Sequence, residues 1–272
     1  MDGGLPQARV LNRGKRLRRL GKAPLVASIV VLALAAAIPG AAAAIAQRPG
    51  ASISSAGSAY RTQVLADHPA AYWRLGEASG TVAADEVGGN AGTYNNEVSL
   101  GQPGALVGDQ DPAVSFDGIN DYVGVPTSSA LNPTSAVTLE AWVRRGDWGS
   151  GIWQSVIGKP GTGQSMNESY ALWFNPANEL IAYFGDGTNF FTVRAPLDTN
   201  WHYVVATYDN AIAKLYVDGA LYTQTASSIQ LTPNALPLTM GRQNSGSTPF
   251  GGLVDEVAFY TTVLPADRIV WD

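Results

Sequence analysis

Between residues 70 and 260 the chain alternates short apolar runs with turn residues, a pattern that predicts β-strands. Each run has the length of a strand and is rich in β-branched or aromatic residues, and no sustained helical period separates the runs. Asp117-Gly118 and Asp218-Gly219 stand between runs as hairpin turns. The predicted strands are 71–75, 113–116, 122–125, 137–143, 155–158, 170–174, 180–184, 190–194, 201–208, 213–217, 221–225, 236–240 and 253–260. About thirteen strands without alternating helices predict an all-β fold, a two-sheet antiparallel sandwich.

The segments that flank this region have other patterns. Residues 47–69 are rich in Ala, Ser and Gly and have no apolar period, so we expect a linker there. Only residues 264–272 (LPADRIVWD) have a helical pattern, with Pro265 in the first turn and Asp267 early. The folded domain is therefore expected to span residues 70–272.

The first 46 residues have the order of a secretory signal. A basic stretch, residues 9–22, precedes an uncharged run, residues 23–46, that ends in small residues. Ala44-Ile45-Ala46 fits a cleavage site and would leave Gln47 as the first mature residue. The alternative is an uncleaved signal anchor, because the 24 uncharged residues exceed the roughly 20 needed to span a bilayer. Either way the domain is expected outside the cytoplasm, secreted or membrane-anchored through this segment.

Charge and cysteine content narrow the function classes. The chain has no cysteine, so disulfides, thiol nucleophiles and thiolate metal sites are excluded. Residues 1–46 hold seven of the 17 Lys and Arg and one of the 22 acids, which leaves 10 basic and 21 acidic residues, a net charge of −11, for the remainder. A body this acidic argues against nucleic-acid binding, which requires clustered Lys and Arg.

An acidic pair, Asp255-Glu256, lies inside the last predicted strand (FGGLVDEVAFY, 250–260). Successive side chains of a strand point to opposite faces, so we expect one carboxylate to face the fold and the other solvent, which is not the arrangement of a catalytic pair. The inward carboxylate needs a partner, and the loop 85–92 (DEVGGNAG) concentrates an acid, an asparagine and glycines. Oxygen donors on a glycine-rich loop predict a hard-cation site, for which calcium is the candidate.

Several segments, taken in order, resemble the laminin-G-like jelly roll of the concanavalin A-like lectin/glucanase superfamily. They are AYWRLGEASGT (71–81), AADEVGGNAGTY (83–94), AVSFDGINDYVGVP (113–126), VTLEAWV (137–143), NWHYVVATYD (200–209), AKLYVDGALY (213–222) and FGGLVDEVAFYTTVLPADRI (250–269). This resemblance extends over residues 70–270. It implies a twisted sandwich with one concave sheet, a secreted ligand-binding or adhesion module, and a calcium ion between the first loop and the last strand.

Carried over to this sequence, the resemblance implies Asp85, Asn90 and Asp255 as calcium ligands, with the backbone carbonyl of Gly92. The loop is shorter than in many relatives and has Val87 in place of a small polar residue, so the second ligand is left open. Without metal, Asp85 would cap a turn and Asp255 would accept hydrogen bonds from loop amides.

Enzymatic residues are not evident in the sequence. Glucanase relatives carry two carboxylates on one face of one strand, whereas strand 137–143 carries only Glu140. No G-x-S-x-G elbow is present, and neither His68 nor His202 has an identifiable nucleophile partner. Glu140 is a candidate ligand contact on the concave sheet or, alternatively, a paired structural acid.

Aromatic residues on loops supply the candidate ligand contacts. Trp148 and Trp153 lie in or beside a glycine-rich loop (GDWGSGIWQ, 146–154), and Phe190-Phe191 follow the turn GDGTN (185–189). Such rings stack on sugars or side chains, or they cap the open ends of a sandwich core. We select Trp148 and Trp153 as ligand contacts.

The patterns together predict a non-catalytic, calcium-stabilised module that binds a carbohydrate or an extracellular protein. An extracellular polysaccharide hydrolase or lyase on the same scaffold is one alternative, and a structural adhesin or surface-layer component is another. A same-face pair of carboxylates would favour the enzyme, and an uncleaved leader would favour the tethered adhesin.

Overall fold

The computed structural model describes residues 56–147, 151–159, 169–243 and 247–270. The described residues belong to one compact unit. The leader 1–46 and the candidate contact Trp148 lie outside the described residues. No helix in the described ranges is long and apolar enough to cross a membrane.

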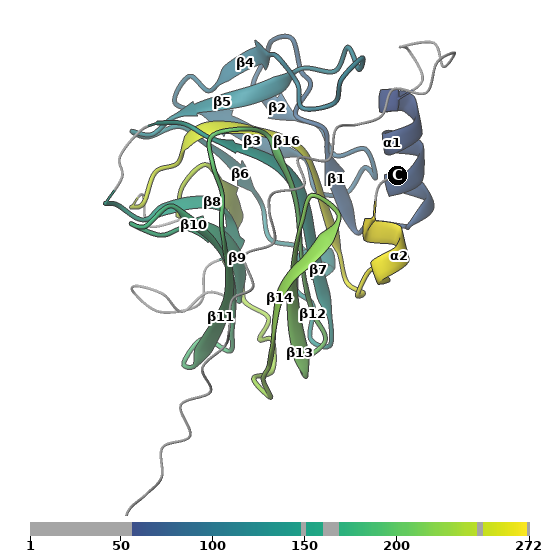
Figure 1. The fold of residues 1–272 in the computed structure, drawn as a ribbon. Helices are drawn as coiled ribbons and strands as arrows, with labels where there is room; N and C mark the ends of the chain where they lie inside the picture. The colour runs from purple at the N-terminus through teal and green to yellow at the C-terminus, as the bar shows by residue number, and fades with distance from the viewer. Residues whose placement is uncertain (1–55, 148–150, 160–168, 244–246, 271–272) are drawn as a thin grey trace, which may run out of the picture. The chain divides into compact units, whose positions relative to one another are not determined.

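Two antiparallel sheets stack face to face, as predicted (Figure 1). Sheet A has the order β14-β13-β12-β7-β16-β5-β4, with β1 also paired to β16, and sheet B has the order β11-β10-β9-β8-β15-β6-β3-β2. The strands of sheet A are β1 (Ala71–Trp73), β4 (Ser99–Gln102), β5 (Ala113–Asp117), β7 (Val137–Arg145), β12 (His202–Tyr208), β13 (Ile212–Val217), β14 (Ala220–Ala226) and β16 (Gly251–Tyr260). Those of sheet B are β2 (Val82–Ala83), β3 (Gly92–Asn95), β6 (Tyr122–Val125), β8 (Gln154–Lys159), β9 (Tyr170–Phe174), β10 (Glu179–Gly185), β11 (Phe190–Pro196) and β15 (Leu238–Met240).

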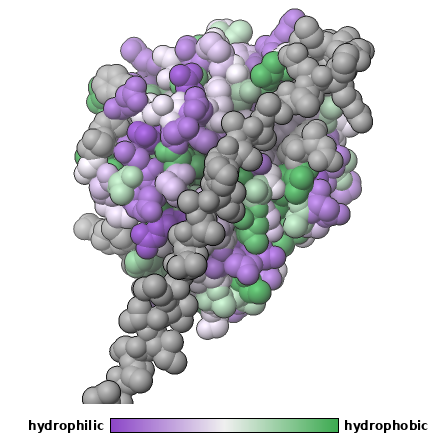
Figure 2. Space-filling view, viewed as in Figure 1, coloured by the Kyte–Doolittle hydropathy of each residue, from purple (hydrophilic) through white to green (hydrophobic). Residues whose placement is uncertain are grey.

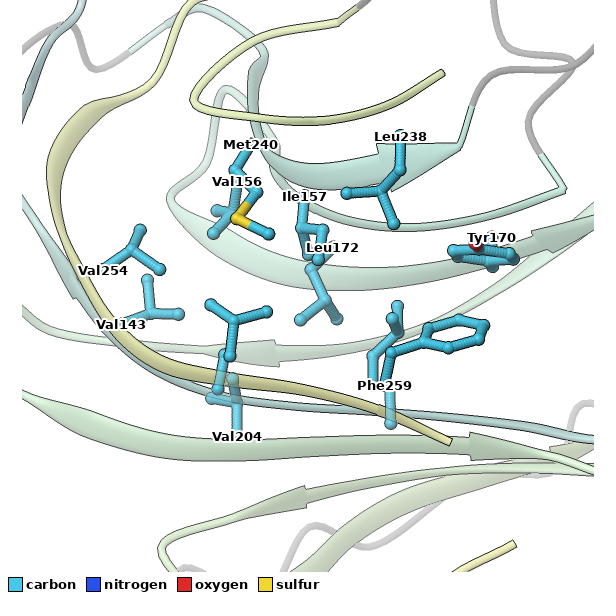
Figure 3. Close-up of a cluster of buried hydrophobic side chains, with 14 of the residues drawn as sticks. Val143, Val156, Ile157, Tyr170, Leu172, Val204, Leu238, Met240, Val254 and Phe259 are labelled. Atoms are coloured by element: carbon cyan, nitrogen blue, oxygen red, sulfur yellow. The ribbon is translucent and has the colours of Figure 1, made fainter. Parts of the chain in front are cut away.

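The main core fills the space between the sheets. Leu172 of sheet B and Val204 and Phe259 of sheet A, all fully buried, point into the same layer (Figure 3). Burial of each such side chain contributes about 1.5–3 kcal/mol. On the face shown in Figure 2, hydrophobic residues are interspersed with hydrophilic ones. The inner faces of the two sheets therefore supply the core, and side chains on the outer faces can build sites there.

Helix α1 (Ala56–Ala66) lies within the range 47–69 and corrects the expectation of a linker for those eleven residues. Tyr60 and Val64, four residues apart, share one face of the helix and are buried against the outer face of sheet A. The helix ends where His68 adopts a φ of 55° and Pro69 follows, because neither continues a helix. Two apolar anchors in an Ala- and Ser-rich stretch are too few to give a visible helical period.

Two further helical segments are short. Helix α2 (Ala266–Ile269) confirms the predicted C-terminal helix, and it lies with α1 beside sheet A (Figure 1). A 3-10 helix spans Ser129–Leu131. Ile269 of α2 is buried in the same outer cluster as Tyr60, so both helices cover one face of sheet A.

A β-bulge in β16 overturns the expected alternation of Asp255 and Glu256. Asp255 pairs with Trp142 of β7 and Ala258 pairs with Glu140, so β16 has one residue more than its partner over this interval. Glu256 has a φ of 53°, which turns the backbone locally. Both carboxylates are consequently buried, at 1% and 0% exposure, and neither faces solvent.

Candidate functional site

The bulge brings three acids together in a buried cluster. One carboxylate oxygen each of Asp111, Asp255 and Glu256 lie within 4.8 Å of one another. Asp111 comes from the loop 103–112, which connects β4 to β5, and the other two come from β16. Because β5 pairs directly with β16, this loop ends beside the bulge.

One cation lies among these acids. The Nη2 group of Arg74 donates to Glu256 at 2.8 Å and to Asp109 at 2.7 Å, and it lies 3.3 Å from Asp111. The hydroxyl of Tyr72 also donates to Glu256. A single guanidinium thus faces several carboxyl groups, which leaves the cluster with an excess of potential negative charge.

Two carboxylate oxygens of the cluster are incompletely paired among the described residues. Asp255 accepts from the Ala105 amide at 2.8 Å through Oδ2, but its Oδ1 is buried without a hydrogen-bond donor, and Oδ2 of Asp111 has only the ion pair with Arg74 at 3.3 Å. Burial, with the neighbouring Glu256 charge second, raises the pKa of Asp255 to about 8. Burial likewise raises the pKa of Asp111 to about 7, against the opposing effect of Arg74. The cluster therefore requires bound protons or a bound cation at neutral pH.

The residues fit a hard cation. Carboxylate oxygens are the ligands calcium prefers, and Oδ1 of Asp255 and Oδ2 of Asp111 accept no hydrogen bond from the described residues. Glycines make room for the carboxyl groups: a Cβ at Gly76 would collide with Asp111, and one at Gly104 would lie 3.1 Å from Asp255. Calcium would be held by Asp111, Asp255 and Glu256 and would supply positive charge to the cluster.

The loop that approaches Asp255 is thus 103–112, whereas the sequence pointed to loop 85–92. The Asp85 carboxylate accepts four backbone N–H bonds, from Tyr72, Val87, Gly89 and Asn90, at 2.8–3.0 Å. This is the turn-capping role that the sequence left as the alternative.

Asn90 and Gly92 are also engaged within the protein. The Asn90 carbonyl accepts from the Trp73 indole at 2.8 Å, and its side-chain amide donates to Ala70 at 3.1 Å. Gly92 lies in β3, where a Cβ would collide with Val123. Of the four implied ligands, only Asp255 belongs to the acid cluster. Asp109 and Asp111 were overlooked because their position depends on the β5–β16 pairing, which the sequence does not reveal.

Glu140 is buried and forms a second polar network on sheet A. Its carboxylate accepts hydrogen bonds from the hydroxyls of Tyr60 at 3.1 Å, Tyr203 at 2.8 Å and Tyr260 at 2.7 Å, and Arg268 lies 3.6 Å away. Burial, and then the Glu140 charge, keep the pKa values of Tyr60 and Tyr260 above the ordinary value, so both hydroxyls remain donors. With 0% exposure and these partners, Glu140 has the contacts of a paired structural acid, one of the two roles that the sequence left open.

Four aromatic rings form a row on the outer face of sheet B. Ring centroids are 5.9 Å apart for Trp153 and Trp173, 6.2 Å for Trp173 and Tyr183, and 4.9 Å for Tyr183 and Phe190. Trp173 and Tyr183 are 4% exposed, Trp153 is half-buried and Phe190 is 48% exposed. We call these four residues the aromatic row.

The aromatic row joins the two loop regions that the sequence singled out. Leu172 and Phe174 on β9 point into the core, so Trp173 between them faces outward. Trp153, immediately before β8, packs against this outer cluster and therefore does not cap the end of the core. Phe190 begins β11 and stacks on Tyr183. The row thus has two buried rings in the middle and one partly accessible ring at each end.

Comparisons with known proteins give similar folds at low identity. The chain is similar to the botulinum neurotoxin serotype D ligand binding domain in complex with N-acetylneuraminic acid (TM-score 0.60, 11% identity, 76% of this chain and 51% of that one). It is also similar to the binding domain of botulinum neurotoxin DC in complex with rat synaptotagmin II (0.58, 12%, 75% and 50%). A third similar structure is Trypanosoma rangeli sialidase in complex with 2,3-difluorosialic acid (0.56, 17%, 73% and 32%).

These likenesses show the fold alone, and the chain spans about half of the toxin domains and a third of the sialidase. No curated protein matches the chain. Residues 117–270, more than half of the chain, match the family model Laminin_G_3, described as the concanavalin A-like lectin/glucanases superfamily. The two-sheet antiparallel sandwich agrees with that match, and the chain belongs to this laminin-G-like family of the concanavalin A-like lectin/glucanases superfamily.

Proposed function

We propose that this chain is a non-catalytic binding module, secreted or held at the cell surface, that recognises a carbohydrate or an extracellular protein. The ligand would bind at the aromatic row on sheet B. We further propose that calcium in the acid cluster stabilises the fold. The aromatic row is the observation that carries the first part.

The aromatic row suits recognition by stacking. Trp173 and Tyr183 are almost fully buried and hold the outer rings in place, while Trp153 and Phe190 present partly accessible rings at the two ends. Aromatic faces contact the apolar faces of sugar rings or the side chains of a protein, and a fixed ring loses little conformational entropy on binding. The similar toxin domains are in complex with N-acetylneuraminic acid and with synaptotagmin II, one ligand of each class.

Calcium would act on stability and not on the ligand. Asp255 and Glu256 belong to β16 of sheet A, whereas the aromatic row crosses β9 and β10 of sheet B. A cation held by these two acids and Asp111 would link the loop 103–112 to β16. Burial raises the pKa of Asp255 and of Asp111 and so favours their protonated forms, and a bound cation would displace these protons.

A glycan array followed by titration calorimetry tests the binding proposal. The full chain is expected to bind a related set of glycans, and Trp153→Ala or Phe190→Ala to weaken binding about tenfold or more, since a stacked ring contributes roughly 1.5 kcal/mol. Ile119→Ala is the control, because Ile119 is 68% exposed in the turn that follows β5. Its affinity should equal that of the wild type.

Three results would contradict the proposal. Glycan affinities that are the same for the wild type and both aromatic variants would place recognition elsewhere. Shortened glycans in the recovered ligand, seen by mass spectrometry, would establish turnover and favour the hydrolase. If the array is empty, the same variants are compared in pull-downs from extracellular protein, where unchanged capture would reject the aromatic row.

A further inference from the structure

The free edges of the two sheets are protected unequally. In sheet B, β2 is only two residues long, and β11 carries the exposed Arg194 and ends in Pro196. In sheet A, β4 is four residues long, has Gly101 at a φ of 69°, and is followed by Pro103. Short length, charge, irregular backbone and proline all hinder pairing with another chain.

Strand β14, the other edge of sheet A, has seven residues without charge or proline, and its one irregularity is a bulge at Tyr222. Its sequence, ALYTQTA, contains no charge and no proline. Six of its seven residues are exposed, and they include residues on each face of the sheet. Leu221 and Tyr222 are 48% and 53% exposed. The register shift against β13 lies near the hairpin turn, and pairing is regular from Thr223 to Ala226. Within the described part of the chain, no strand pairs with the outer side of β14.

We infer that β14 pairs antiparallel with β14 of a second copy of this chain. Antiparallel pairing of one strand with itself is two-fold symmetric, so the same edge serves both partners and the assembly closes as a dimer. Seven residues extend about 24 Å, enough for a ladder of backbone hydrogen bonds between the copies. Sheet A would then continue from one copy into the other.

The charge distribution makes the β14 edge a more favourable contact between two copies than the other, more acidic faces of the chain. Outside residues 1–46 the chain carries 21 acids against 10 basic residues, so two copies repel each other over much of their surface. An uncharged strand is a place where identical chains approach without this cost. Since the aromatic row belongs to the other sheet, the dimer would present two rows, which raises avidity for a repetitive ligand.

Cysteine scanning tests the pairing, because the chain has no cysteine of its own. Single variants Tyr222→Cys, Thr223→Cys, Gln224→Cys and Thr225→Cys are made in the full chain and oxidised mildly. A disulfide requires Cα atoms within about 7 Å, and in a two-fold antiparallel pair the separation of equivalent residues grows by about 7 Å per residue from the symmetry centre. We therefore expect a reducible dimer at one or two adjacent positions, with cross-linking falling at least fivefold at the others.

Thr192→Cys is the matched control, since Thr192 lies within the edge strand β11, which carries Arg194 and Pro196. It should cross-link only at the background level. The inference is overturned if the β14 variants cross-link no more than this control, or equally at all four positions, which indicates random collision. Cross-links formed only to another protein would assign the edge to a different partner.

Discussion

Replacing Glu140 by Gln is expected to destabilise the fold strongly without touching the ligand site. The carboxylate accepts three tyrosine hydroxyls from α1, β12 and β16, at 2.7–3.1 Å. Glutamine has nearly the same shape, so the change removes the charge and substitutes an amide for one acceptor oxygen. At least one hydroxyl must then turn and accept, and Arg268 loses one of its neighbouring charges.

The magnitude follows from burial. Charge-assisted hydrogen bonds contribute about 1.5–3 kcal/mol each, but the amide retains part of them. Removing one partner of a buried ionic network costs about 3–5 kcal/mol, and we expect Glu140→Gln to fall in that range. In a domain of this size about 1 kcal/mol lowers Tm by roughly 2–4 °C, so the loss should be on the order of 10 °C.

Thermal unfolding by circular dichroism measures the effect, with Glu179→Gln as the control. Glu179 pairs with Arg194 at 3.5 Å, and Arg194 is 61% exposed, so this control should change stability by less than about 1 kcal/mol. Tyr60→Phe is made in the wild type and in Glu140→Gln. This double-mutant cycle gives the coupling free energy between Tyr60 and Glu140, expected at about 1–3 kcal/mol. A Tm equal to that of the control, together with lost glycan binding, would refute the structural role and restore Glu140 as a ligand contact.

The acid cluster gives two further predictions. Millimolar calcium is expected to raise the Tm of the wild type relative to chelator, because a ligand bound only by the folded state stabilises it. The Tm of Asp255→Asn should be the same in both buffers. A wild-type Tm that is also the same in both buffers would show that the cluster does not bind calcium. In chelator, the free energy of unfolding is expected to fall as pH rises from about 4 to 8, by up to ~1.4 kcal/mol per pH unit. Folded Asp255 keeps its proton up to a pKa of about 8, whereas the unfolded chain loses it near its ordinary value. Asp255→Asn should show a shallower slope in a urea series, and equal slopes would contradict a buried neutral acid.

The sandwich was predictable because its long strands obey simple alternation or are continuously apolar. Strand 137–143 is seen as β7 (Val137–Arg145), and 170–174 as β9 (Tyr170–Phe174). The strands β2, β3 and β4, two to four residues each, were missed because so few residues give no period. Helix α1 was missed for a related reason, since its stability comes from tertiary contacts of Tyr60 and Val64.

The site was predictable only where local sequence decides the chemistry. The loop aromatic Trp153 lies where the glycine-rich loop put it, and its connection to Phe190 follows from strand order. The positions of Asp255 and Glu256 were not predictable in this way, because one extra residue in β16 reverses the side of the sheet on which Glu256 lies. The residue types Asp255 and Glu256 do not indicate a bulge. A positive φ is rare for glutamate, so the sequence favoured a regular strand with alternating side chains.

The proposed binding site and the acid networks lie on different sheets. Glu140 on β7 and the acids of β16 lie on neighbouring strands of sheet A, where α1 and the loop 103–112 cover them. The aromatic row lies on the outer face of sheet B, and the apolar core fills the space between the two sheets. Substitutions in the acid networks should therefore shift Tm and leave ligand affinity unchanged in the folded fraction, while Trp153→Ala should do the reverse. A variant of Glu140 that weakens ligand binding at a temperature where it is fully folded would show that the core transmits strain between the sheets, and the two functions would then have to be treated as coupled.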